Sequence, residues 1–161
     1  MRFTPKEADP LVDSVRKVVE GLGMSLIELS VSRHKTSVQI RTVVYKNGST
    51  GVDDCSKAHH ALLARLELAF PGQDLYVEVS SPGIDRNIKD GSEFKHFVGR
   101  GIRCFRTDIS DWSCGVLESA DENAVVLKVK REEKDEMITL KYEVIAKAKL
   151  DYSQETHNLW Q

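Results

Sequence analysis

Hydrophobic periodicity changes near residue 87, and this change constrains the fold more than any other feature of the sequence. Before it, residues 6–22 and 52–70 carry apolar side chains at spacings of three and four, which is the pattern of an amphipathic helix. After it, apolar residues occur only in short alternating runs, which is the pattern of half-buried strands. We therefore expect two parts of different architecture, helices packed on a sheet and then strands alone.

The first part also contains strand patterns. Period-two alternation predicts strands at residues 26–32, 37–46 and 75–80. The short link between the first two predicts a hairpin. The order helix, strand, strand, helix, strand indicates an N-terminal α/β domain over residues 1–87, with a three-stranded sheet and two helices on one face.

The second part, residues 88–161, is expected to be a small β-barrel domain, so the fold class is α+β. One helical turn is predicted at residues 93–97. Strands are predicted at residues 102–106, 113–118, 124–130 and 137–142, and residues 144–152 could close the barrel. The polar residues 87–93 have the composition of a linker. Residues 153–161 are expected to be loosely held, apart from a possible docking role for Trp160.

Composition limits the functions that the chain can have. Of its 161 residues 30% are charged, and the formal net charge is -2, which does not indicate a strongly basic nucleic-acid binder. Three cysteines without a CxxC pair favour a reducing compartment. Without a long apolar run or an apolar N-terminal segment, we expect a cytoplasmic, monomeric protein that does not bind membranes.

No cofactor, metal or small-molecule substrate is indicated. His59 and His60 are neighbours on a helix, so their rings point about 100° apart. Cys55 precedes His59 by four residues, which suits a ligand pair, but Cys55 lies on the apolar stripe and is expected to be a buried structural cysteine. The sequence also lacks a GxSxG nucleophile motif and a glycine-rich phosphate loop.

The segment VEVSSPGIDR at residues 77–86 ends the third strand with a rigid turn, because Pro82 fixes φ and Gly83 permits a left-handed conformation. Two interpretations remain open. In the first, the turn is a structural corner, with Ile84 packed into the core and Asp85 paired with Arg86. In the second, the turn binds a partner. The residues that would do so are Ser81, Pro82, Gly83, Asp85 and Arg86.

The segment FKHFVGRGIRCFRT at residues 94–107 combines cations and phenylalanines and contains no acid. We expect the phenylalanines, Phe94, Phe97 and Phe105, to be core residues. The cations could neutralise the phosphates of a nucleic acid or form a solvated face, and the sequence favours neither. These cations are Lys95, Arg100, Arg103 and Arg106.

Taken together, these motifs resemble the ribosome maturation factor RimP family. The turn at 77–86 and the segment EFKHFVGRGIRC at 93–104 resemble its signature, and GLGMSLIELSV at 21–31, GVDDC at 51–55 and IAKAKL at 145–150 extend the resemblance over both halves. The family's SPGLDR turn falls on residues 81–86, and its Phe…Phe-x-Gly-Arg segment falls on residues 94–100.

The resemblance implies an N-terminal α/β domain followed by an SH3-like (Sm-like) barrel. It also implies a non-enzymatic factor that binds immature small (30S) ribosomal subunits, with rRNA and a ribosomal protein near the decoding centre as partners. Asn87 replaces the family's usual proline, which leaves the linker less rigid. The loop at 107–113 has no match, and its Trp112 could be a contact or a plug.

Two other functions compete with this one. A general single-stranded RNA-binding module is the first, because Sm-like barrels can bind short single strands. A hydrolase that uses Ser81 and Asp85 is the second and weaker alternative. A preference for small subunits over free RNA would separate the assembly factor from the first alternative, and an absence of turnover would count against the second.

Overall fold

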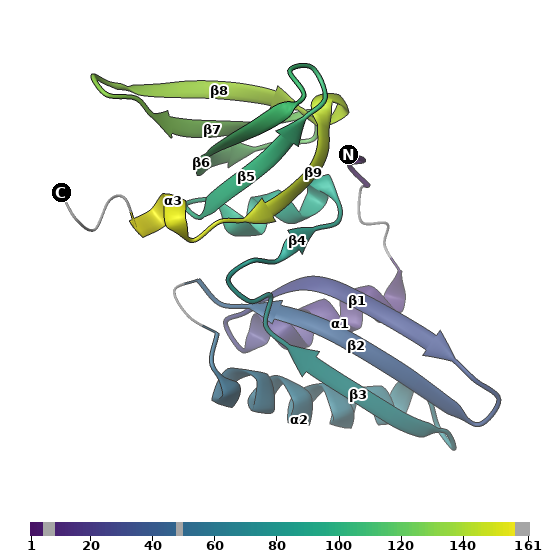
Figure 1. The fold of residues 1–161 in the computed structure, drawn as a ribbon. Helices are drawn as coiled ribbons and strands as arrows, with labels where there is room; N and C mark the ends of the chain where they lie inside the picture. The colour runs from purple at the N-terminus through teal and green to yellow at the C-terminus, as the bar shows by residue number, and fades with distance from the viewer. Residues whose placement is uncertain (5–8, 48–49, 157–161) are drawn as a thin grey trace. The chain divides into compact units, whose positions relative to one another are not determined.

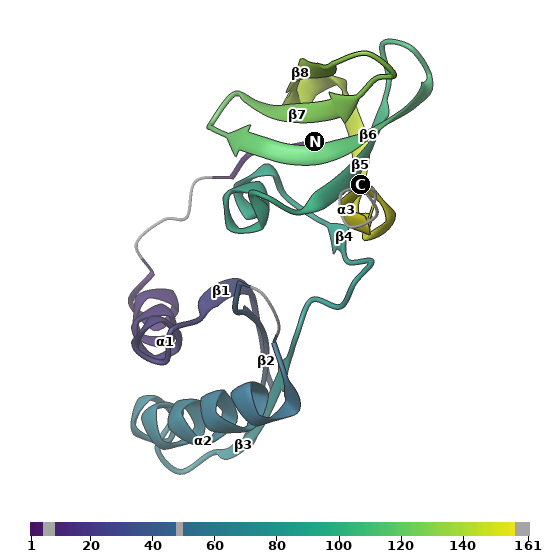
Figure 2. The same cartoon turned by 90° about the vertical axis from the view of Figure 1, so that its left-hand side faces the viewer.

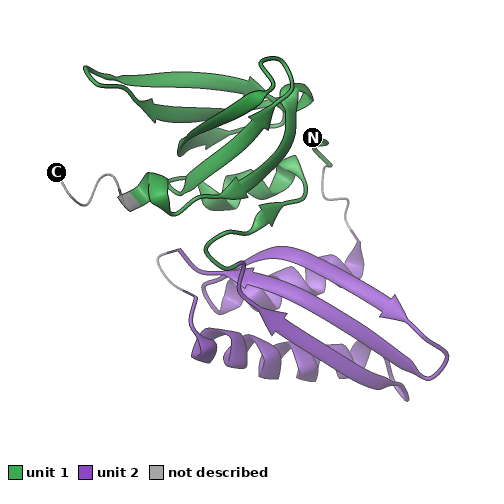
Figure 3. Cartoon of the chain, in the orientation of Figure 1, with its two compact units in different colours: residues 1–6, 83–161 green, residues 7–82 purple. Residues whose placement is uncertain are grey.

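A computed structural model of the chain describes residues 1–4, 9–47 and 50–156. The chain divides into two compact units, one of residues 7–82 and one of residues 1–6 with 83–161 (Figure 3). Helices and sheets occur together, so the α+β class is confirmed. The predicted division into domains 1–87 and 88–161 stays a prediction.

The unit of residues 7–82 contains the predicted three-stranded sheet with two helices on one face (Figures 1 and 2). Strands β1 (Ser25–Arg33) and β2 (Ser37–Tyr45) form an antiparallel pair, as expected for a hairpin. Strand β3 (Asp74–Ser80) lies parallel to β2, so the sheet order is β1-β2-β3. Alternate residues of β2, among them Val38, Ile40 and Val44, are buried against the helices.

Helix α1 (Pro10–Gly21) begins later than the predicted residue 6, because the carboxylate of Asp9 accepts a hydrogen bond from the backbone of Leu11 and caps the helix there. Residues 6–8 of the predicted helix lie outside the described residues. Helix α2 (Val52–Ala69) begins after Gly51, whose N–H donates to the Asp54 carboxylate at 3.0 Å. The two helices supply Val15, Val19, Ala58, Leu62 and Leu66 to the core.

The unit that begins at residue 83 is built on a six-stranded antiparallel sheet of order β4-β9-β5-β6-β7-β8. Its strands are β4 (Asn87–Ile88), β5 (Gly101–Arg106), β6 (Asp111–Ala120), β7 (Ala124–Lys130), β8 (Asp135–Lys141) and β9 (Ile145–Leu150). The 3-10 helices are η1 (Gly91–Phe97) and η2 (Tyr142–Val144), and α3 (Ser153–Thr156) is a short α-helix.

Two sequence-based expectations for this unit are wrong. Residues 87–93 are not a linker, because they form β4 and the start of η1. Residues 153–156 are not loosely held, because they form α3 and Glu155 of this helix pairs with Arg100. Trp160 lies outside the described residues.

The sheet is not closed into a barrel by hydrogen bonds. Strands β4 and β8 are its two edges, and no pairing between them occurs in the described part of the chain. Strand β9, expected to close a barrel, lies between β4 and β5 and pairs with both. The core contains Phe94 and Phe97, both fully buried as predicted. Within residues 1–4, 9–47 and 50–156, no helix has both the length and the apolar character needed to cross a bilayer.

Candidate functional site

The turn that follows β3 presents small and exposed groups. Gly83 has φ of 77°, a left-handed conformation that a side chain disfavours, in agreement with the turn chemistry predicted for Pro82 and Gly83. Ile84 is 67% exposed, so the expectation that it packs into the core is wrong. Asp85 is also exposed and has no hydrogen bond or ion pair with another described residue. The tip of the turn therefore offers an apolar side chain and a carboxylate to solvent.

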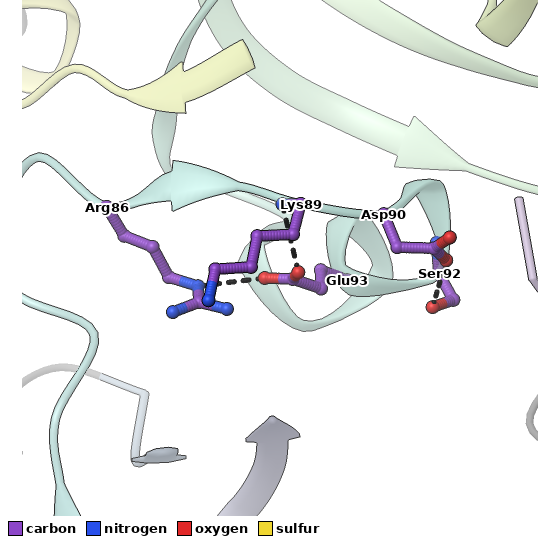
Figure 4. A network of polar contacts seen from close by, with 5 residues as sticks. All are labelled: Arg86, Lys89, Asp90, Ser92 and Glu93. Atoms are coloured by element: carbon purple, nitrogen blue, oxygen red, sulfur yellow. Dashed lines mark hydrogen bonds and ion pairs between the residues drawn. The ribbon is translucent and has the colours of Figure 1, made fainter. Parts of the chain in front are cut away.

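Arg86 lies differently, because its side chain is buried. It points toward Glu93 (Figure 4). Its Nε donates a hydrogen bond to Oε1 of Glu93 at 2.8 Å, and the two side chains are only 8% and 7% exposed. The carbonyl of Arg86 also accepts a hydrogen bond from the backbone of Leu150 at 2.9 Å. The expected pairing of Arg86 with Asp85 is therefore wrong, and the guanidinium of Arg86 holds the chain rather than facing a partner.

Glu93 and Asp90 make further hydrogen bonds within residues 86–93, which we call the corner (Figure 4). The second oxygen of Glu93 accepts the backbone N–H of Lys89 at 3.0 Å. Asp90 caps η1 by accepting hydrogen bonds from the backbone and hydroxyl of Ser92, and it also accepts two hydrogen bonds from Thr4. Partial burial works to raise the pKa of Asp90, but the hydrogen bonds from Ser92 and Thr4 outweigh it and lower that pKa.

The four cations predicted to bind rRNA are not a uniform basic patch. Arg100 pairs through Nε with Glu155, which also accepts the backbone N–H of Gly101 at 2.9 Å. Arg106 donates to both carboxylate oxygens of Asp108, at 3.1 and 2.7 Å. Hydrogen bonding within the Arg106 pair raises the pKa of Arg106 and lowers that of Asp108. Carboxylates therefore pair with both arginines, from Glu155 on α3 for Arg100 and from Asp108, two residues along the chain, for Arg106.

The other two cations are more available. Lys95 lies exposed on η1 and has no ion pair with another described residue. Arg103 is 38% exposed and lies 3.6 Å from the carboxylate of Asp151, beyond hydrogen-bonding distance. Its guanidinium lies over the ring of Trp112, with Cζ at 5.1 Å from the ring centroid. Trp112 is thus part of a surface cluster rather than a plug in the core.

Phe105 differs from the prediction that all three phenylalanines are core residues. It is half-buried and contacts Trp112 edge to face, with ring centroids 5.4 Å apart. The ammonium of Lys147 lies over both rings, at 5.8 Å from Phe105 and 5.7 Å from Trp112. Phe105 faces outward because its neighbour Cys104, on the opposite face of β5, is fully buried. That burial raises the pKa of the Cys104 thiol to about 12, with a smaller contribution from nearby Cys114.

The described residues contain little that suggests catalysis. Among them, no group of three or more histidine, cysteine or acidic side chains is arranged to hold a metal ion. Cys55 packs against the core, and burial together with the neighbouring Asp54 raises the pKa of its thiol, which keeps it a weak nucleophile. Ser81 and Asp85 are both exposed at the turn, and no hydrogen bond joins them in the described part of the chain.

Sequence reasoning missed four functional candidates. Glu93 and Asp90 were not singled out, although an acid at the start of a 3-10 helix is a recognisable capping signal. Lys147 and Lys149 were also missed, although their alternation with alanine in IAKAKL predicts that both face outward from one strand.

Comparison with known proteins identifies relatives across most of the chain. The family model of the RimP N-terminal domain matches residues 14–85. A ribosome maturation factor RimP of Borrelia turicatae (strain 91E135) is 31% identical over 136 residues, which cover 84% of this chain and 90% of the relative. A ribosome maturation factor RimP of Borrelia recurrentis (strain A1) is 29% identical over 140 residues, covering 87% of this chain and 93% of the relative.

Solved structures add nothing to this assignment. A variant of the MamM CTD is 12% identical and covers 45% of this chain and 92% of its own, with a TM-score of 0.33, which is too low to carry an argument. The sequence relatives are decisive. Because the 31% identity to the Borrelia turicatae relative extends over 84% of the chain, this protein belongs to the ribosome maturation factor RimP family.

Proposed function

We propose that this protein is a non-enzymatic ribosome assembly factor that binds immature small (30S) ribosomal subunits in the cytoplasm and assists their maturation. Family membership is the observation that carries the proposal, because the match covers 84% of this chain and 90% of a relative named ribosome maturation factor RimP. The family model of the RimP N-terminal domain covers residues 14–85, and so most of the turn that follows β3. We propose further that the protein acts as a monomer without cofactor or small-molecule substrate.

The second unit is proposed to be an SH3-like (Sm-like) barrel that forms a domain of its own. Its antiparallel strands β5, β6, β7 and β8 follow one another along the chain and in the sheet, as in a meander. Gly115 lies in the middle of β6, where a Cβ would come within 2.6 Å of the Lys128 carbonyl. Such a close approach of two backbones suits the strong bending that small barrels require.

One partner surface is proposed at the exposed turn. Asp85 carries a negative charge with no partner in the described part of the chain, and Ile84 beside it is 67% exposed. Ribosomal proteins are basic, so an unpaired carboxylate beside an apolar side chain suits a ribosomal protein near the decoding centre. Ser81, Pro82 and Gly83 give this tip its shape. Arg86 holds the turn through Glu93, so we propose that it positions the contact rather than making it.

A second surface is proposed for rRNA, with Lys95 and Arg103 as its main cations. Both have side chains that reach solvent, and neither side chain donates a hydrogen bond to another described residue. Arg100 and Arg106 are held by carboxylates, so they contribute less to a phosphate site than the sequence suggests.

Co-sedimentation through a sucrose gradient tests the proposal. The purified protein is mixed with separated small and large subunits at low and at moderate salt. We expect comigration with small subunits alone, persisting at moderate salt. Equal association with both subunits that is lost as salt rises would refute the assembly factor and leave the general single-stranded RNA-binding module, which the aromatic and basic side chains around Trp112 favour.

Charge changes localise the contact. Asp85→Lys is expected to weaken association with small subunits, whereas Asp74→Lys, at another exposed acid, is the matched control and should have no effect. Equal binding of the two variants would remove the turn from the contact surface.

A further inference from the structure

Five side chains form a compact cluster on the outer face of strands β9, β5 and β6. We call this cluster the aromatic–cation face, and it consists of Arg103, Phe105, Trp112, Lys147 and Lys149. Strand register places them together, since Phe105 lies opposite Trp112 on one side and Lys147 on the other, and Arg103 lies opposite Lys149. Ile102 and Cys104 alternate with them along β5 and are fully buried, so the cluster faces away from the core.

Cations lie over the two rings. Arg103 lies 5.1 Å from the ring centroid of Trp112, and the ammonium of Lys147 lies 5.7 Å from the same centroid. Phe105 contacts the indole edge to face at 5.4 Å, which fixes the orientation of the Trp112 ring. Both rings are only half-buried, so part of each is open to solvent.

The charges on this face are poorly matched by acids. Lys147 and Lys149 have no carboxylate within ion-pair distance in the described part of the chain. Arg103 has one, Asp151 at 3.6 Å, and its buried Nε has no hydrogen-bond partner. In a chain of net charge -2, three cations with so little compensation are a local excess of positive charge beside two aromatic rings.

We propose that the aromatic–cation face binds a single-stranded RNA segment, with one unpaired base stacked on Trp112. Flanking phosphates would lie on Lys147, Lys149 and Arg103. This inference rests on the proposed function, and it names the part of the rRNA that the protein contacts. Flat rings within reach of several cations are the combination by which proteins hold single strands without reading their sequence.

In this proposal the Lys147 side chain moves off the ring of Trp112 when a base binds there. An exposed ammonium is held over a ring only weakly, whereas base–aromatic stacking is stronger. Its four-carbon stem is flexible, so the ammonium can leave the rings and move to a phosphate while the base takes its place. A duplex could not do the same, because its bases are already stacked on one another. An acidic peptide would satisfy the cations but would leave the rings unused.

The fluorescence of Trp112 can show whether a base is stacked on its ring. The chain has two tryptophans, so a Trp160→Phe variant leaves Trp112 as the only indole. We expect a ten-nucleotide oligouridylate to quench the fluorescence of this variant saturably, and the same length of duplex RNA to quench it far less. Trp112→Ala should weaken binding of the labelled oligonucleotide on the order of tenfold, while Trp112→Phe retains most of it. Tyr76→Ala, at an exposed aromatic of the other unit, is the control.

The salt dependence tests the phosphate contacts separately. Lys147→Gln with Lys149→Gln should reduce the slope of log K against log salt by about 1.4, since each phosphate contact to a single strand contributes about 0.7. Lys17→Gln with Lys57→Gln, at exposed lysines of α1 and α2, should leave the slope unchanged. Circular dichroism melting of every variant separates a binding loss from unfolding.

Three results would overturn the inference. The first is an absence of quenching by the oligonucleotide together with equal affinity of Trp112→Ala. The second is equal quenching by duplex. The third is a loss of subunit association in Trp112→Ala without any binding of free RNA, which would assign the face to a protein partner. If the oligonucleotide quenches Trp112 but the protein does not comigrate with small subunits, the stacking site stands and the proposed assembly function fails.

Discussion

Glu93→Ala is expected to destabilise the unit that begins at residue 83, because it breaks a buried ion pair. The carboxylate of Glu93 accepts hydrogen bonds from Nε of Arg86 at 2.8 Å and from the backbone of Lys89 at 3.0 Å. Both charged side chains are more than nine-tenths buried. Removing the carboxylate therefore takes a buried ion-pair partner from the guanidinium and the acceptor from a backbone amide at the same time.

The expected loss is large. Breaking a buried ion pair by removing one partner costs about 3–5 kcal/mol, because the remaining charge stays out of water. We take the lower end of this range, about 3 kcal/mol, as the expected loss. For a unit of this size each kcal/mol lowers the melting temperature by about 4–8 °C, so the unit should melt at least about 12 °C lower.

Native-state hydrogen exchange and thermal melting measure this effect. The Leu150 amide donates to the Arg86 carbonyl, so its protection reports on the corner directly. Glu78→Ala is the matched control, because Glu78 pairs with Arg41 at 3.3 Å but both side chains are more than 60% exposed. We expect the control to cost less than about 1 kcal/mol.

Two outcomes bear on the reasoning. If Glu93→Ala destabilises no more than Glu78→Ala, the buried pair of Arg86 and Glu93 does not hold the corner. A double change of Arg86→Met with Glu93→Leu should recover much of the loss, because apolar side chains of similar volume remove both buried charges together.

Other substitutions test the same structure elsewhere. Asp90→Asn should destabilise the protein at neutral pH, and the difference in melting temperature from wild type should vanish in acid. The pKa of Asp90 is lowered in the folded state, so the stabilisation by its carboxylate is fully present above the ordinary aspartate pKa of about 3.9. That stabilisation is lost as the pH falls through the pKa of the folded state. Gly101→Ala should lower the free energy of unfolding by about 1–3 kcal/mol or more, since its Cβ would lie 2.1 Å from the Asp151 carbonyl oxygen. Urea denaturation measures this loss. Gly21→Ala is the control and should leave the free energy of unfolding unchanged, because nothing lies within 4 Å of the new Cβ. Asp85→Ala should leave melting unchanged because the side chain has no partner among the described residues, while it weakens small-subunit association in the gradient; a drop in melting temperature would mean that Asp85 stabilises the turn.

Local sequence patterns predicted most of the elements. Apolar spacing of three and four located α1 and α2, and alternation located β1, β2, β3 and β5 to β9, with small differences in their ends. Strand β4 was not predicted. The turn at Pro82 and Gly83 was also predictable, because proline and glycine restrict or extend φ whatever surrounds them. These features depend on residues close together in the chain.

The errors have a different origin. Residues 87–93 have the polar composition of a linker, but they are ordered through contacts with β9 and with Thr4, both far away in sequence. Ile84 looks like a core residue by its type, yet it lies at the tip of a turn where the backbone directs it outward. The type of a side chain indicates whether it favours burial or solvent. Whether it is buried depends on packing against segments that are distant in sequence.

The basic segment at residues 94–107 shows the same division. Its cations are evident from the sequence, and so is its lack of acids. How much of this positive charge is neutralised depends on the tertiary structure, since Glu155 pairs with Arg100 from 55 residues away and Asp151 lies near Arg103. Strand pairing likewise brings Lys147 over Trp112. Periodicity therefore determines the elements because it acts through neighbours along the chain, whereas ion pairs and stacked rings depend on Coulombic and packing forces between segments that only the tertiary structure places together.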